Sequence, residues 1–203
     1  MLLLAFLIII SYLIGSIPTA FLAAKIKNLA DIRNEGTGNM GATNALIVIG
    51  PAMGLLVYFI DLFKGLIPVL MARNILGTDV SMGLCGLAAI LGHDFPVYIG
   101  FKGGKGVATE SGVIFVLNQF VMWLIIPCWI VLVFITDQFI LSSLICMLLV
   151  PVFFAAFRQP SIFITFGTLY FLLGLFAHRA DIARIAAGKE KSARASLSKY
   201  FGK

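Results

Sequence analysis

Long apolar runs dominate this sequence, and they limit the folds that the chain can adopt. A helix needs about 20 mostly apolar residues to cross the hydrocarbon core of a bilayer. Seven such runs follow one another, roughly at Leu2–Ala24, Gly54–Leu76, Ser81–Ile99, Val107–Gln119, Phe120–Thr136, Phe139–Phe157 and Ser161–Ala177. The fourth run is short, and only the polar pair Asn118-Gln119 separates it from the fifth. The pattern predicts an all-α, polytopic integral membrane protein with seven transmembrane helices.

The amino-acid composition also indicates a protein that folds in a lipid bilayer. Only 12% of the 203 residues are charged and 61% are hydrophobic, whereas a soluble domain carries roughly 25% charged residues. We expect one membrane-embedded domain over residues 1–203, ending in a basic tail from about residue 178. The first run lacks a positively charged leading segment, so it is expected to stay as a helix rather than to be cleaved as a signal peptide. The three cysteines lie inside apolar runs without metal-ligand spacing, so no metal is expected.

The basic residues indicate an orientation, because Lys and Arg collect on the cytoplasmic side of a membrane. Twelve of the 15 fall on one side if seven helices alternate: Lys25, Lys27, Arg33, Lys102, Lys105, Arg179, Arg184, Lys189, Lys191, Arg194, Lys199 and Lys203. We therefore expect an N-terminus outside, and a cytoplasmic C-terminus on the side of the polar loops. A net charge of +6 would indicate nucleic acid in a soluble protein. Here the membrane explains it, and no nucleic-acid partner is expected.

The first polar loop, "DIRNEGTGNMGATN", follows the first run. Glycines at positions 36, 38 and 41 permit positive φ, and amide groups turned inward in such a segment form a concave anion site. The candidate ligand residues are Thr37, Gly38, Asn39 and Asn44. The alternative is an interfacial turn whose glycines only permit tight bends.

The second polar loop, "GHDFPVYIGFKGGKGVATESG", carries more charge. Gly103, Gly104 and Gly106 surround Lys105, and helical composition resumes directly afterwards. Amide groups at a helix start favour an anion, and a lysine adds a full charge. The spacing of a nucleotide P-loop is absent, so the loop predicts phosphate chemistry without bound ATP. The alternative is that Lys102 and Lys105 serve only the charge bias of the membrane.

Five ionisable residues lie inside the apolar runs or at their ends. Asp61 and Lys64 share a helical face at i,i+3 and are expected to pair, bracing the bundle beneath a polar site. His93, at the end of the third run, either satisfies a local hydrogen bond or acts as a base. His178, where the seventh run ends, either closes the same pocket together with Arg179 or belongs to a basic amphipathic helix on anionic headgroups.

The blocks "GSIPTA", "DIRNEGTGNMGATN", "DLFKG", "GHDFPVYIGFKGGKGVAT" and "HRADIARIAAGKE" together resemble the bacterial acyl-phosphate:glycerol-3-phosphate acyltransferase family, PlsY. The resemblance implies acyl transfer from an acyl phosphate to the 1-hydroxyl of glycerol 3-phosphate in the cytoplasmic membrane of a bacterium, without a cofactor. Its partners would be those two substrates and membrane lipid. Lys105 and the glycines beside it, with Lys102 and Thr109, would hold the departing phosphate. The base would be His93, His178 or a substrate phosphate oxygen.

The chain departs from the pattern of that family at five positions, the mildest of which is Thr37 in place of a serine, a change that keeps the hydroxyl. Ile47 stands where the family usually has an arginine, Ile140 where it has a serine, Ala177 where it has an arginine and Asp181 where it has an asparagine. A carboxylate about 4 Å from a phosphate would repel it by roughly 4 kcal/mol at an effective dielectric near 20. Two alternatives follow: a paralogue that acylates another hydroxylated acceptor, or a non-enzymatic lipid-binding or transport protein of the same fold.

Overall fold

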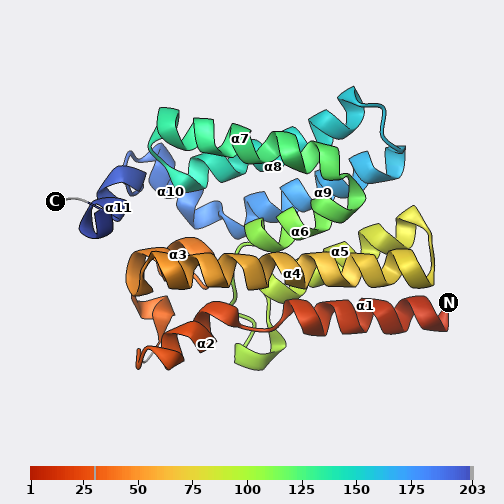
Figure 1. Ribbon diagram of the computed structural model, residues 1–203, viewed down its shortest axis with the longest axis horizontal. Coiled ribbons are helices and arrows are strands. Elements are labelled where there is room, and N and C mark those ends of the chain that lie inside the picture. Colours follow the sequence, from red (N-terminus) through yellow and green to blue (C-terminus); the bar gives the residue numbers. More distant parts are fainter. Residues whose placement is uncertain (30, 202–203) are drawn as a thin grey trace. The chain divides into compact units, whose positions relative to one another are not determined.

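The computed structural model describes residues 1–29 and 31–201, and the regular structure in these ranges is helical (Figure 1). The elements in chain order are α1 (Leu2–Gly15), α2 (Thr19–Ile26), η1 (Ile32–Asn34), α3 (Ala42–Ile49), α4 (Pro51–Ile75), α5 (Asp79–Asp94), η2 (Val97–Ile99), α6 (Val107–Leu117), α7 (Gln119–Thr136), α8 (Phe139–Ala156), α9 (Ser161–Ala177), α10 (Arg179–Ala186) and α11 (Ala193–Phe201).

The described helices confirm an all-α polytopic fold but not the count of seven spans. Five are long and apolar enough to cross a membrane, at Leu2–Ile26, Pro51–Ile75, Asp79–Ile99, Gln119–Thr136 and Phe139–Ala156. A sixth follows if α9 and α10, bent by 66° at their junction, count as one span. Helix α6 has 11 residues and is shorter than the five candidate spans. The described part of the chain therefore has five or six candidate spans.

The first predicted span contains a break that the hydropathy pattern does not show. Helix α1 ends at Gly15 and α2 begins at Thr19, with Pro18 between them. Proline has no amide N–H and its ring clashes with the preceding helical turn, so it interrupts a helix. The break leaves the Ile17 carbonyl outside the regular helical ladder, at the level of the polar site described below.

The chain divides into two compact units, Met1–Gln119 and Phe120–Lys203. The prediction of a single membrane-embedded domain stays a prediction. In the first unit α4 packs against α1, α3, α5 and α6, and α1 also packs against α5. Glycines lie at two of these contacts: a Cβ on Gly65 of α4 would overlap the Thr109 carbonyl of α6, and one on Gly112 of α6 would overlap the Leu62 carbonyl of α4. Such small residues let helix backbones approach closely where lipid removes the hydrophobic drive for association.

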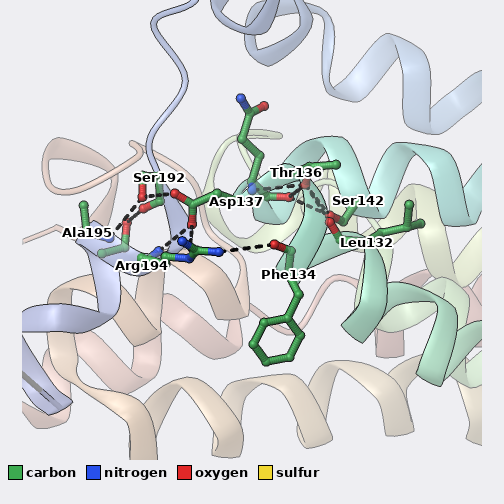
Figure 2. A network of polar contacts seen from close by, with 10 residues as sticks. Leu132, Phe134, Thr136, Asp137, Ser142, Ser192, Arg194 and Ala195 are labelled. Carbon is green, nitrogen blue, oxygen red and sulfur yellow. Dashed lines mark hydrogen bonds and ion pairs between the residues drawn. The ribbon is translucent and has the colours of Figure 1, made fainter.

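In the second unit, α8 packs against α9, and aromatic side chains link α7 to α8. Trp129 of α7 stacks on Phe139 at a centroid distance of 6.0 Å. The turn between these helices also holds the C-terminal segment, as Figure 2 shows. The Asp137 carboxylate accepts hydrogen bonds from Ser192 Oγ at 2.5 Å and from the Arg194 amide at 2.9 Å. These bonds attach the start of α11 to the α7–α8 turn.

Candidate active site

The two glycine-rich loops meet in the first unit. One pocket is lined by residues from both loops and from the helices around them: Ile17, Pro18, Thr19, Met40, Lys64, His93, Pro96, Gly103 and Gly104. It encloses about 180 Å³ of empty space, part of which is open to solvent. The loops also touch directly, since Arg33 Nη1 donates to the Ile99 carbonyl at 3.5 Å. The pocket thus joins residues that lie far apart in the sequence.

The first loop is organised by Asn44, at the start of α3. Its side-chain oxygen accepts the Thr37 amide at 2.7 Å, and its Nδ2 donates toward the carbonyls of Ile32, Glu35 and Asn39. The side chain has no exposed surface. Asn44 therefore holds the loop in shape through its side chain, and its binding of a ligand stays a prediction.

Two of the three glycines in this loop have the expected backbone conformation. Gly36 and Gly38 adopt positive φ, at 62° and 73°. Gly41 does not: its φ is −104°, and it is the N-cap residue of α3. The segment after it, predicted as loop, is helical from Ala42 onward. Thr37 and Asn39 are half-buried and Gly38 is exposed, so these three residues stay available as ligand candidates.

The second loop is folded back onto the end of α5. The amide of Gly103 donates to the Asp94 carbonyl at 3.1 Å, and that of Gly104 to the His93 carbonyl at 3.0 Å. Both predicted phosphate donors are therefore already engaged within the chain. The amides of the first turn of α6, which follows this loop, have no partner within the helix. Gly106, at φ 74°, sets the direction in which α6 leaves the loop.

The two lysines of this loop differ in their surroundings. Lys102 is exposed, whereas Lys105 is half-buried and within electrostatic range of Asp94. The surroundings of Lys102 fit its alternative interpretation as a residue that serves the membrane charge bias. Lys105 is half-buried just before the N-cap residue of α6, so its positive charge lies at the start of that helix.

A buried charge cluster lies in the wall of the pocket. Lys64 Nζ is 2.7 Å from Asp61 Oδ1, which confirms the predicted pair. The same nitrogen donates to the Ile17 carbonyl at 2.7 Å and lies 3.3 Å from His93 Nδ1. Asp61, Lys64 and His93 are all buried. The cluster joins α4 and α5 to the break between α1 and α2.

Sequence analysis missed a second buried polar group beneath the second loop. Asp94 and Glu110 are both buried, and neither Asp94 carboxylate oxygen has a hydrogen-bond partner in the described chain. Thr109 is likewise fully buried, and its hydroxyl has no such partner. The acidic residues of "GHDFP" and "ATES" were the available signal, since a carboxylate beside an apolar run is costly unless it serves a site.

The predicted residues of the C-terminal block belong to the second unit. His178 Nδ1 lies 2.9 Å from the Gly174 carbonyl, one turn earlier in its own helix. Arg179 donates to the Phe176 carbonyl at 2.9 Å and lies over the Phe176 ring. That His178 and Arg179 close the pocket of the first unit stays a prediction.

The charge of Asp181 is compensated within the second unit. The carboxylate of Asp181 pairs with Arg184, which also donates to Glu190 at 2.9 Å. Asp181 is buried, so this pairing weakens the repulsion of a phosphate that an isolated carboxylate would cause.

The fold and the pocket together define an integral membrane protein with a polar site built from glycine-rich loops, a buried lysine–histidine cluster and a lysine at a helix start. A family model described as "Glycerol-3-phosphate acyltransferase" matches residues 5–188. The chain belongs to this family.

Individual relatives agree with that assignment. A glycerol-3-phosphate acyltransferase of Syntrophomonas wolfei is 34% identical over 186 residues, covering 92% of this chain and 95% of the relative. Glycerol-3-phosphate acyltransferase 2 of Lactobacillus acidophilus is 40% identical over 190 residues, with coverages of 92% and 88%.

Solved structures show the same likeness. The glycerol 3-phosphate form of PlsY, an integral membrane glycerol 3-phosphate acyltransferase, superimposes with a TM-score of 0.90 at 36% identity, covering 93% of this chain and 94% of that one. The lysophosphatidic acid form gives 0.87 at 34% identity, with the same coverages.

Proposed function

We propose that this chain transfers an acyl group from an acyl phosphate to the 1-hydroxyl of glycerol 3-phosphate, giving lysophosphatidic acid and inorganic phosphate. The meeting of the two glycine-rich loops in one pocket carries the proposal. Family membership and the two PlsY crystal forms, described with glycerol 3-phosphate and with lysophosphatidic acid, support it. The same membership argues against a non-enzymatic relative of the fold.

The reaction needs a positioned hydroxyl, a proton acceptor and stabilisation of the departing phosphate. Lys105 and the first turn of α6 supply a positive charge and amide donors at one place, which lowers the barrier where negative charge develops on the leaving group. The first loop, with Thr37 and Asn39, would position the acceptor. The acyl chain would lie between helices in the lipid.

The assay for this proposal uses the purified protein in detergent or in lipid nanodiscs. Palmitoyl phosphate and glycerol 3-phosphate are supplied together, and both phosphate release and lysophosphatidic acid are measured. We expect Lys105→Ala to lower kcat/KM for the acyl phosphate by about 10²–10³-fold, the usual effect of removing one group that stabilises a leaving or tetrahedral oxyanion. Unchanged turnover in this variant would remove Lys105 from the phosphate site.

A second acceptor is favoured by one observation. Ile47, which replaces the arginine expected from the resemblance, is half-buried in α3 and supplies no charge to a phosphate on the acceptor. Glycerol and simple alcohols should therefore be offered beside glycerol 3-phosphate. Acyl transfer to glycerol 3-phosphate alone would exclude the second acceptor, and faster transfer to an uncharged alcohol would replace the first.

We also propose that the pocket faces the cytoplasm. The basic residues of the first and second loops support this orientation through the positive-inside rule. The exposed Lys27, changed to cysteine in a chain without native cysteines, should react with a membrane-impermeant maleimide only after cells are opened. Labelling in intact cells would reverse the topology.

A further inference from the structure

We propose that His93 acts in the reaction as a neutral hydrogen-bond donor, presenting its Nε2–H to a phosphate oxygen in the pocket, and that Lys64 and Asp61 fix this tautomer. The inference rests on the proposed function, because the ligand is the phosphate of its substrate. It assigns His93 a role different from that of a general base, and it makes Lys64 and Asp61 positioning residues.

The ring nitrogen of His93 that lies next to Lys64 is Nδ1. An ammonium group has three N–H donors and no acceptor. Lys64 Nζ has three neighbours within reach: the Ile17 carbonyl at 2.7 Å, Asp61 Oδ1 at 2.7 Å and His93 Nδ1 at 3.3 Å. An ammonium beside Nδ1 can only donate to it, so Nδ1 must accept. A neutral imidazole that accepts at Nδ1 carries its proton at Nε2.

The other ring nitrogen of His93, Nε2, lies next to Gly104. A Cβ built on Gly104 would overlap His93 Nε2, and both residues line the pocket. The ring therefore turns its Nε2 edge toward the glycine loop, where Gly104 leaves room for it. This edge also lies beside the segment that carries Lys105, the proposed phosphate ligand. A neutral N–H beside a cation is a suitable donor set for a phosphate.

Histidines that act as bases have a different neighbour at Nδ1. In a Ser-His-Asp triad a carboxylate accepts the Nδ1–H, so Nε2 is left as the base. Here Asp61 Oδ1 is 3.8 Å from His93 Nδ1, beyond hydrogen-bond distance, and Lys64 Nζ lies closer. Replacing the carboxylate by an ammonium reverses the tautomer. The carboxylate of Asp61 pairs with Lys64 Nζ at 2.7 Å, so its effect on His93 passes through that lysine.

The test exploits two amides that mimic different nitrogens of the ring. Glutamine places its amide nitrogen near the position of Nε2, whereas asparagine places its amide near Nδ1. We expect His93→Gln to keep kcat/KM for palmitoyl phosphate within about tenfold of the native protein, with an unchanged pH profile. His93→Asn should lose about 10²–10³-fold, as when one oxyanion donor is removed. Equal losses in the two folded variants, or equal retention, would overturn the donor role.

A second readout does not depend on activity. The chain has only two histidines, so ¹⁵N-labelled histidine gives two sets of ring signals, and His93→Gln identifies those of His93. We expect a pyridine-type Nδ1 and a protonated Nε2 in the native protein. In Lys64→Met this preference should disappear. A proton found on Nδ1 of the native protein would refute the proposal, whereas failure of the native protein to use palmitoyl phosphate would refute the proposed function and leave the tautomer result standing.

Discussion

Removing Lys64 should expose the energetic cost of the buried charge cluster. Lys64→Met keeps the volume of the side chain but leaves Asp61, which is 1% exposed, without its cationic partner. Neither oxygen of Asp61 has a hydrogen bond of good geometry from any described residue. Of the neighbours described above, only His93 Nδ1, 3.8 Å from Asp61 Oδ1, would then remain near the carboxylate. Breaking such a buried pair typically costs about 3–5 kcal/mol.

The loss should be visible in the melting temperature. A deficit of about 3–5 kcal/mol corresponds to roughly 6–20 °C for a chain of this size.

Thermal unfolding in detergent at pH 7 measures this loss. Lys27→Met, the same change at an exposed lysine, should stay within about 0.5 kcal/mol of the native protein. The double variant Asp61→Leu/Lys64→Met removes both charges and should recover most of the lost stability, since apolar replacements of buried pairs are often neutral. A deficit below about 1 kcal/mol in Lys64→Met, or a double variant that is no more stable than Lys64→Met, would refute the reasoning.

Three further changes test the packing, the first loop and the C-terminal attachment. Gly65→Ala, which drives a methyl into the backbone of α6, should destabilise by more than about 2 kcal/mol. Gly167→Ala, whose Cβ would lie 3.3–3.5 Å from the Phe154 ring and Pro151, should cost clearly less in the same melting assay. Asn44→Ala should cost about 1–3 kcal/mol because it leaves buried backbone groups unsatisfied, and the exposed Asn34→Ala should cost almost nothing. The hydrogen bond from the Ser192 hydroxyl lowers the pKa of Asp137 below its ordinary 3.8, so the attachment of α11 should persist above that pH and weaken as the pH falls through the lowered value. Asp137→Asn should accelerate amide exchange in α11 at pH 7, and unchanged exchange would contradict the attachment.

The bounds of α7 and α8 were predictable because hydropathy depends only on the residues within each apolar run. The predicted runs Phe120–Thr136 and Phe139–Phe157 differ by one residue at a single end from α7 and α8. The pairing of Asp61 with Lys64 was predictable for a similar reason, since i,i+3 spacing is a local property of a helix. The helix bounds and the Asp61–Lys64 pair both depend only on residues within a single helix.

Contacts between elements were not predictable in the same way. The Asn44 hydrogen bonds depend on the path of the loop, which brings the carbonyls of Ile32, Glu35 and Asn39 to one side chain. The engagement of the Gly103 and Gly104 amides depends on where the end of α5 lies. A glycine-rich segment beside a lysine indicates an anion site by composition, but composition does not reveal which amides the fold itself consumes.

The break between α1 and α2 is a local feature of the sequence that also determines a contact between elements. Non-helical backbone at membrane depth is tolerated only where its polar groups find partners inside the protein. Pro18 makes such a break, and the Ile17 carbonyl left by it accepts a hydrogen bond from Lys64 at 2.7 Å. The cost of interrupting one span is thus offset by a partner for a buried cation on another, and that cation in turn holds His93 at the edge of the pocket. The segment "GSIPTA", three of whose residues line the pocket, also supports the site through its backbone. A variant that restores the helix there, Pro18→Ala, should therefore weaken the binding of acyl phosphate even though a continuous span would be the better membrane helix.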